Sequence, residues 1–151
     1  MATPDWSEGF PVEVGAYVLG LAEASPETAG YWEGVARNVL LLKRCPRCRA
    51  FLHPRRMVCP ACGTAPLEWQ QASGRGTIYT YSAVHRAPRP EFKDSIPYYV
   101  GIVALEEEVH LFTRFFAREP GRIRIGAAVS VEFRQLETGE KLPVFFVAES
   151  P

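Results

Sequence analysis

Two closely spaced cysteine pairs constrain the fold of this chain more than any other feature. Cys45-Pro-Arg-Cys48 and Cys59-Pro-Ala-Cys62 contain all four cysteines of the 151-residue sequence. Each pair forms a tight knuckle that presents two sulfur atoms, and two knuckles supply the four thiolates of a tetrahedral zinc site. Four protein ligands leave no position for a catalytic water, so the spacing predicts a structural zinc ion. A redox dithiol is the weaker interpretation, because a second matching pair is present.

Short segments of strand character surround the two knuckles. Residues 39–44 lead into the first pair, residues 49–52 return from it as the second strand of a hairpin, and residues 67–71 follow the second pair. This order of hairpin, knuckle, spacer, knuckle and strand predicts a zinc ribbon over residues 39–72. Because so short a segment buries little core, metal binding should supply most of its stability, roughly 10–16 kcal/mol in small zinc peptides.

The predicted ribbon is strongly basic, although the chain as a whole has 17 basic and 17 acidic residues. No acidic residue lies between Gly34 and Leu67, and seven basic residues do: Arg37, Lys43, Arg44, Arg47, Arg49, Arg55 and Arg56. A zinc ion with four thiolates carries about two negative charges, which leaves this region near +5. The region invites an anionic ligand or an acidic protein surface, whereas the neutral total charge gives no general reason to expect nucleic acid or an anionic membrane.

The N-terminal region is predicted to contain an arm and one helix. Residues 1–24 combine prolines and glycines with scattered apolar residues, which indicates an arm that docks on another surface or, alternatively, a floppy terminus. Ser25-Pro26-Glu27 is a helix-start signal, and apolar residues then recur at helical spacing, so we expect a helix at residues 26–37, within a segment spanning 25–38.

The sequence also predicts where the protein resides. No apolar run reaches the roughly 18 residues of a membrane-spanning helix, and the acidic N-terminus lacks the basic flank of a secretory signal. Paired cysteines that bind metal suit a reducing compartment. We therefore expect a cytoplasmic protein.

From Gly74 onward the pattern changes to short alternating strands punctuated by glycine and proline. A proline-rich loop at residues 86–97 follows the first strand, and a loop with one helical turn follows the third. Interruptions at these places suit a small, partly open barrel of the OB type over residues 73–151. The fold class is therefore mainly β, with an N-terminal helix, a zinc ribbon and a five-stranded OB-fold barrel. The five predicted strands are residues 77–85, 98–105, 109–116, 127–133 and 143–147, with a turn at 137–139 between the last two.

Several motifs together resemble a known protein family. They are Tyr31-Trp32-Glu33-Gly34, the two cysteine pairs, Ser73-Gly74-Arg75-Gly76-Thr77-Ile78-Tyr79, Val84-His85-Arg86, Pro97-Tyr98 and Arg124-Ile125-Gly126. Over about residues 28–147 the chain is similar to the zinc-ribbon plus OB-fold accessory proteins found beside thiolase-like and other acyl-CoA enzymes. The resemblance implies a rubredoxin-like ribbon, an OB barrel and an N-terminal helix.

The same resemblance implies a function. It indicates a non-catalytic small subunit that binds a thiolase, a hydroxymethylglutaryl-CoA-synthase-like enzyme or a steroid side-chain aldolase in a hetero-oligomer and helps form the coenzyme A channel. Two-subunit thiolases of aromatic degradation, such as benzoylsuccinyl-CoA thiolase, are one such group. We assign no catalytic residue, and the acyl substrate and the partner stay open.

Basic residues are the candidate contacts of coenzyme A. The ligand carries a 3′-phosphate and a diphosphate, which guanidinium groups bind in a bidentate manner. The candidates are Arg44, Arg47, Arg49, Arg55 and Arg56 in the ribbon, and Arg86, Arg89 and Lys93 in the barrel loop. Solvated surface charges and contacts to a partner are the alternatives. Gly74-Arg75-Gly76 precedes a strand and indicates a turn rather than a phosphate cradle.

Two other kinds of function fit parts of the sequence. OB barrels and zinc ribbons also bind single-stranded nucleic acid, and the predicted strands carry aromatic residues for stacking, which are Tyr79, Tyr81, Tyr98, Tyr99, Phe112 and Phe115. The neutral total charge argues against an extended phosphate-binding track. A free-standing enzyme would need a catalytic constellation, and His85 has no serine, carboxylate or spare cysteine that the sequence pairs with it.

Overall fold

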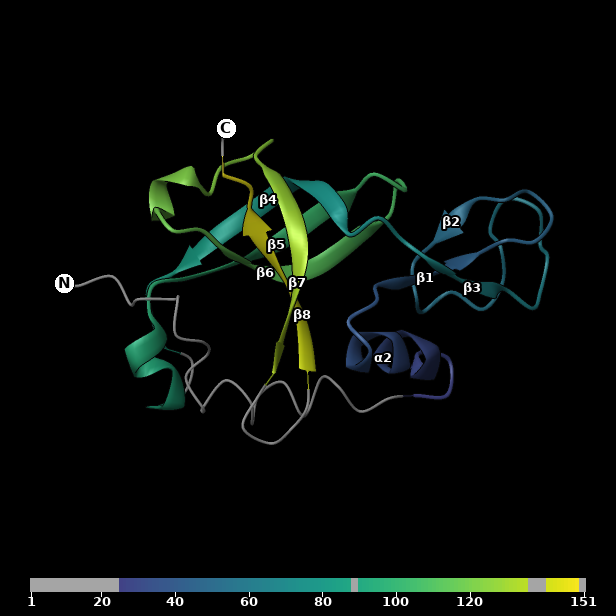
Figure 1. Ribbon diagram of the computed structural model, residues 1–151, viewed down its shortest axis with the longest axis horizontal. Helices are drawn as coiled ribbons and strands as arrows, with labels where there is room; N and C mark the ends of the chain where they lie inside the picture. The colour runs from purple at the N-terminus through teal and green to yellow at the C-terminus, as the bar shows by residue number, and fades with distance from the viewer. Residues whose placement is uncertain (1–24, 88–89, 136–140, 150–151) are drawn as a thin grey trace.

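The computed structural model of the chain describes residues 25–87, 90–135 and 141–149, and it shows a barrel with a ribbon at one side and a helix beside both (Figure 1). The arm predicted at residues 1–24 and the turn predicted at 137–139 lie outside these residues. None of the helices in the described ranges is long and apolar enough to cross a membrane. The elements are α2 (Ala29–Ala36), β1 (Leu41–Arg44), β2 (Phe51–Leu52), β3 (Glu68–Gln71), β4 (Arg75–Val84), the 3-10 helix η2 (Pro90–Ser95), β5 (Tyr98–Leu105), β6 (His110–Phe116), the 3-10 helix η3 (Pro120–Arg122), β7 (Ala128–Gln135) and β8 (Lys141–Val147).

The ribbon is a three-stranded antiparallel sheet in the order β2-β1-β3. Arg44 at the end of β1 pairs with Phe51 on one side and with Glu68 on the other. The first cysteine pair connects β1 to β2, and the second lies between β2 and β3. The predicted hairpin and third strand are therefore confirmed, with β1 beginning two residues later than expected.

The five C-terminal strands form a closed barrel in the order β4-β5-β6-β8-β7. Closure depends on antiparallel pairing of β4 with β7 and on a short parallel pairing of β6 with β8, at Phe115↔Phe145 and Phe116↔Phe146. The five predicted strands are confirmed, but the barrel is closed rather than partly open. The closing pairs join segments far apart in sequence, which the local strand pattern does not report.

One hydrophobic core extends from the ribbon into the barrel. Leu40 and Leu42 beside and on β1 belong to the same buried cluster as Ile78, Val103 and Phe115 of the barrel strands. Leu42 is fully buried. Because the two parts share this core, we expect ribbon and barrel to stabilise each other.

Helix α2 packs against both parts and begins later than predicted. Residues 25–28 form a turn in which the Thr28 amide donates to the Ser25 carbonyl at 2.9 Å, so Pro26 precedes the helix instead of opening it. Gly30 permits close packing on β3, since a Cβ there would lie 2.3 Å from Nε1 of Trp69. On the barrel side, Lys141 Nζ of β8 donates to the Ala36 carbonyl at 3.2 Å.

Candidate metal centre and basic ribbon surface

The two cysteine pairs adopt matching knuckle conformations. In the first knuckle the Arg49 amide donates to the Cys45 carbonyl at 3.0 Å, and in the second the Gly63 amide donates to the Cys59 carbonyl at 2.8 Å. Arg49 and Gly63 occupy equivalent positions and both have left-handed backbone, with φ of 67° and 70°. Glycine adopts this region freely, whereas another residue costs roughly 1–2 kcal/mol there.

The knuckles bring four sulfur atoms to one point. Sγ of Cys45 lies 3.5 Å from Sγ of Cys62, and Sγ of Cys48 lies 3.5 Å from Sγ of Cys59. All four atoms lie within 4.8 Å of one another. A zinc ion with Zn–S bonds of about 2.3 Å places its ligands about 3.8 Å apart in a tetrahedron. The four cysteines therefore form a zinc-ribbon site whose donor set and spacing fit Zn²⁺.

Hydrogen bonds favour ionisation of two of these thiols. Burial opposes the thiolate of Cys45, but hydrogen bonds with the amides of Cys48 and Arg47 and with the thiols of Cys62 and Cys48 together lower the pKa of Cys45 to about 6. The Thr64 hydroxyl lies 3.1 Å from Sγ of Cys62 and lowers the pKa of Cys62. Thiolates are the form that binds zinc, so these contacts prepare the site for the metal.

Crowding of the sulfur atoms opposes full ionisation when no cation is present. The Ala50 amide favours the thiolate of Cys48, but the neighbouring Cys45 and Cys59 raise the pKa of Cys48 to about 11. A divalent cation among the four sulfur atoms removes this repulsion. The centre thus fits a closed structural site and leaves no ligand position for substrate.

The ribbon arginines form an exposed positive surface around the metal centre. Arg44 is held in place, because its Nε donates to the Arg49 carbonyl at 3.1 Å and its guanidinium lies 4.9 Å from the Phe51 ring centre. In the described part of the chain, the ion pairs do not involve the four exposed guanidinium groups of this surface, Arg47, Arg49, Arg55 and Arg56. These side chains are available to an anion.

His53 supports the loop that carries two of these arginines. Its Nδ1 accepts a hydrogen bond from the Arg55 amide at 3.1 Å. Burial, and then the charges of Arg55 and Arg56, lower the pKa of His53. The imidazole is therefore neutral at pH 7 and adds no charge to the ribbon surface.

The structure separates Lys93 of the barrel loop from the candidate residues of the ribbon. Arg86 and Lys93 are exposed, whereas Arg89 lies outside the described residues. Lys93 is on η2, the short teal-green helix at the side of the barrel opposite the ribbon (Figure 1). One phosphate group therefore cannot contact both Lys93 and the ribbon arginines within a single chain.

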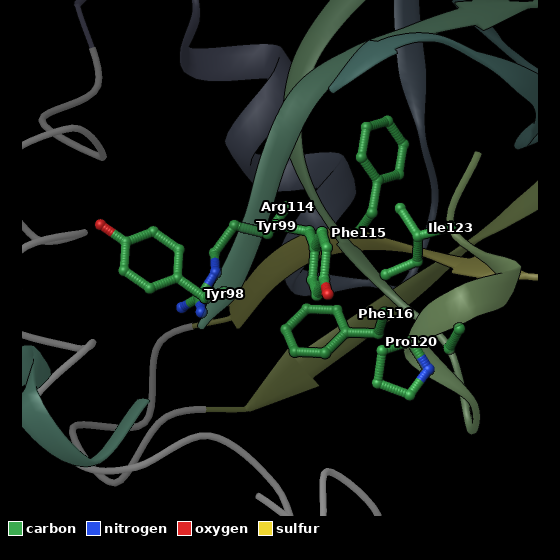
Figure 2. A pocket seen from close by; sticks show the side chains of 8 residues that line it. Tyr98, Tyr99, Arg114, Phe115, Phe116, Pro120 and Ile123 are labelled. Carbon is green, nitrogen blue, oxygen red and sulfur yellow. The ribbon is translucent and has the colours of Figure 1, made fainter. Parts of the chain in front are cut away.

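A cavity at the barrel wall is too small for a ligand. It measures about 10 Å³ and is lined by Tyr98, Arg114 and Phe116 among other residues, as Figure 2 shows. That volume corresponds to about one water molecule. The Arg114 guanidinium lies 4.6 Å from the Tyr98 ring centre and 5.5 Å from that of Phe116. Burial lowers the pKa of Arg114 to about 10, although the interaction with Tyr98 acts in the opposite direction and raises it. The guanidinium therefore stays charged at pH 7 and can form cation–π contacts.

A larger hollow of about 320 Å³ lies where η3, the start of β7 and the end of β8 meet. Its lining contains two arginines and one glutamate with small and aliphatic residues, but no serine, cysteine or histidine: Gly121, Arg122, Arg124, Ala127, Ala128, Val147, Ala148 and Glu149. Neither hollow brings a nucleophile and a base together. The alternating pattern of β6 gave no sign that the guanidinium nitrogens of Arg114 would be buried, so sequence reasoning missed it.

The fold and the metal centre together define a zinc-ribbon and OB-barrel protein, and comparisons with known proteins agree. Residues 32–68 match the family model described as the ChsH2 rubredoxin-like zinc ribbon domain, and residues 69–134 match the ChsH2 C-terminal OB-fold domain. A DUF35 domain-containing scaffold protein of Methanothermobacter thermautotrophicus is 36% identical over 117 residues, which cover 76% of this chain and 87% of the relative. The chain belongs to this DUF35 family, with the ribbon and barrel domains of ChsH2.

Two further relatives are described as an aldolase and as a subunit of a hydratase. A chain from a solved structure, described as Ltp2-ChsH2(DUF35) aldolase, superposes with a TM-score of 0.75 at 31% identity, covering 84% of this chain and 98% of that one. A probable enoyl-CoA hydratase alpha subunit of Thermomonospora curvata is 32% identical over 119 residues. These residues are 79% of this chain but only 37% of the hydratase subunit. The chain thus spans little more than a third of that relative.

Proposed function

We propose that this chain is a non-catalytic accessory subunit of a heteromeric acyl-CoA enzyme that makes or breaks carbon–carbon bonds. The observation that carries the proposal is the similarity to the chain described as Ltp2-ChsH2(DUF35) aldolase. The superposition covers 84% of this chain and 98% of that one. The larger catalytic subunit supplies the nucleophile and the base. This chain contributes binding energy and orientation of the substrate. Its cysteines suit a reducing compartment, and we place it in the cytoplasm.

The motifs of the sequence favour a thiolase-type partner, such as a benzoylsuccinyl-CoA thiolase, as the first candidate. An aldolase is the second, and the similarity to the chain of the Ltp2-ChsH2(DUF35) aldolase favours it. The two reactions differ in their co-substrate, because thiolysis consumes free coenzyme A and aldol cleavage does not. An assay of the purified complex with and without free coenzyme A therefore distinguishes them, and the isolated chain should catalyse neither.

The ribbon arginines are the proposed contacts of the coenzyme A phosphates. Arg55 and Arg56 are exposed on the loop that His53 supports, and Arg47 and Arg49 lie in the first knuckle. Guanidinium groups bind phosphate with two parallel hydrogen bonds, and fixed positions reduce the entropy that binding must overcome. The zinc site holds these positions, so the metal acts on ligand binding through the backbone.

Charge reversal tests these contacts in the assembled complex. The double variant R55E/R56E should weaken coenzyme A binding at least about tenfold, because it replaces two cations with two anions. R124E, on the exposed loop before β7, is the matched control and should change binding little. Dephospho-coenzyme A, which lacks the 3′-phosphate, reports which phosphate is bound. Equal effects of both variants on coenzyme A binding would exclude the ribbon as its site.

A further inference from the structure

The outer face of β4, β5 and β6 carries aromatic side chains that the core does not use. Phe112 of β6 is 69% exposed and Tyr79 of β4 is 58% exposed. Thr80 pairs with Ile102, and Ile102 with Phe112, so these side chains lie on one face of the sheet. We call the group of Tyr79, Thr80, Ile102, His110 and Phe112 the barrel face.

A β-bulge places Thr80 on the same face as Tyr79. Ile78 pairs with Val103 and Thr80 pairs with Ile102, so Tyr79 is an extra residue between them. Ile78 is buried in the core, whereas Tyr79 and Thr80 are both exposed. Regular alternation would turn Thr80 back toward the core, and the bulge re-aims it outward. The Tyr79 ring contacts the imidazole of His110 on β6 in a tilted arrangement, with ring centroids 4.6 Å apart.

The five side chains of the barrel face include no carboxylate, ammonium or guanidinium group. At one end, Arg75 and Glu106 neutralise each other in an ion pair of 3.1 Å. At the other end, the guanidinium nitrogens of Arg114 are buried. A strand of nucleic acid needs cations along its phosphates in addition to stacking aromatic rings. The neutral barrel face matches instead the core of a protein interface, where charged residues are depleted and aromatic residues enriched.

We propose that the barrel face docks the catalytic subunit through an uncharged, apolar patch on that subunit. This inference rests on the proposed function and adds the surface through which the chain binds the catalytic subunit. Phe112 and the Tyr79–His110 pair supply the buried centre of the contact, the position where aromatic residues contribute most to binding. The positive ribbon surface remains available for the coenzyme A phosphates. Docking should therefore depend little on salt, unlike coenzyme A binding.

The experiment uses the full zinc-loaded chain and the catalytic subunit that co-purifies with it from its native host. Phe112→Ser and Tyr79→Ser should each weaken binding to that subunit at least about tenfold. Met57→Ser is the matched control, because Met57 is 65% exposed but lies in the ribbon; it should change binding less than about twofold. Zinc content and the thermal midpoint, measured for each variant, show that the fold is unchanged.

Different results would contradict the docking surface and the proposed accessory function. If Phe112→Ser binds the subunit as tightly as the wild type, or Met57→Ser weakens binding as much, the barrel face is not the docking surface although the proposed function stands. If no catalytic subunit co-purifies, both proposals fail. Light scattering that shows a dimer disrupted by Phe112→Ser, or oligonucleotide binding lost in that variant, would assign the face to a second copy or to nucleic acid and overturn docking.

Discussion

Replacing Gly101 by alanine should destabilise the barrel, because β4 leaves no room for a side-chain atom opposite this residue. A Cβ at Gly101 would lie 2.1 Å from the Thr80 carbonyl oxygen and 2.7 Å from Cα of Tyr81. Both are backbone atoms, so no change of rotamer relieves the overlap. A Cβ almost never comes closer than 3.0 Å to another atom, and β4 and β5 must therefore separate beside the bulge that carries Tyr79.

The magnitude follows from two opposing effects. Overpacking of this kind costs about 1–3 kcal/mol, while alanine lowers the entropy of the unfolded chain and returns about 0.4–1 kcal/mol. The net loss should be about 1.3 kcal/mol, which lowers the thermal midpoint by roughly 3–5 °C in a chain of this size. Urea unfolding of the zinc-loaded protein, followed by tryptophan fluorescence, measures the free energy of unfolding.

Gly121→Ala is the matched control for this measurement. No atom lies within 4 Å of the position that a Cβ would take at Gly121, and its backbone is not left-handed. The control should leave the free energy of unfolding unchanged or raise it by less than about 1 kcal/mol. Equal unfolding midpoints for Gly101→Ala and Gly121→Ala would refute the reasoning about close strand approach.

Three further predictions concern the ribbon. Cys48→Ser should lose stoichiometric zinc in elemental analysis, because three thiolates no longer close the tetrahedron; full zinc retention would contradict the site. Arg49→Gly should raise the free energy of unfolding by about 0.5–1 kcal/mol, since it relieves the left-handed backbone of Arg49, whereas Arg47→Gly should show no gain. Removal of zinc by a chelator should lower the thermal midpoint of ribbon and barrel together, because Leu40 and Leu42 share the core of the barrel; a barrel transition that does not move would show that the two parts unfold independently.

Much of the fold was predictable because its signals are local. The spacing of Cys45, Cys48, Cys59 and Cys62 is enough to predict a ribbon, and the structure brings their sulfur atoms within 4.8 Å of one another. The alternation in residues 98–105 predicts β5 with the boundaries that it has, Tyr98–Leu105. Glycine after the second cysteine pair also agrees with the left-handed turn at Gly63.

What the sequence missed depends on contacts between distant segments. The pairing of Phe115 with Phe145 closes the barrel between segments that are far apart along the chain, and no local pattern reports it. Ser25 and Pro26 look like a helix start, but the Ser25–Thr28 turn moves the start to Ala29. The bulge that exposes Thr80 next to Tyr79 likewise depends on the register with β5.

The candidate coenzyme A contacts were predictable only as a set of charges. The sequence grouped Arg44 to Arg56 by composition, and the structure distinguishes Arg44, which Phe51 and the Arg49 carbonyl hold, from its exposed neighbours. It also separates Lys93 on η2 from the whole ribbon set (Figure 1). A charge pattern in the sequence indicates the sign of the charge on a ligand. The position of the binding site depends on how the loops fold.

The most direct test of the accessory role is purification of the tagged, full-length chain from its native host, with mass determination of the complex and an acyl-CoA assay. We predict a complex with a larger subunit that cleaves or forms carbon–carbon bonds in an acyl-CoA, and no turnover by the zinc-loaded chain alone. Turnover by the isolated chain, or recovery of a monomer that carries nucleic acid and no catalytic subunit, would contradict it.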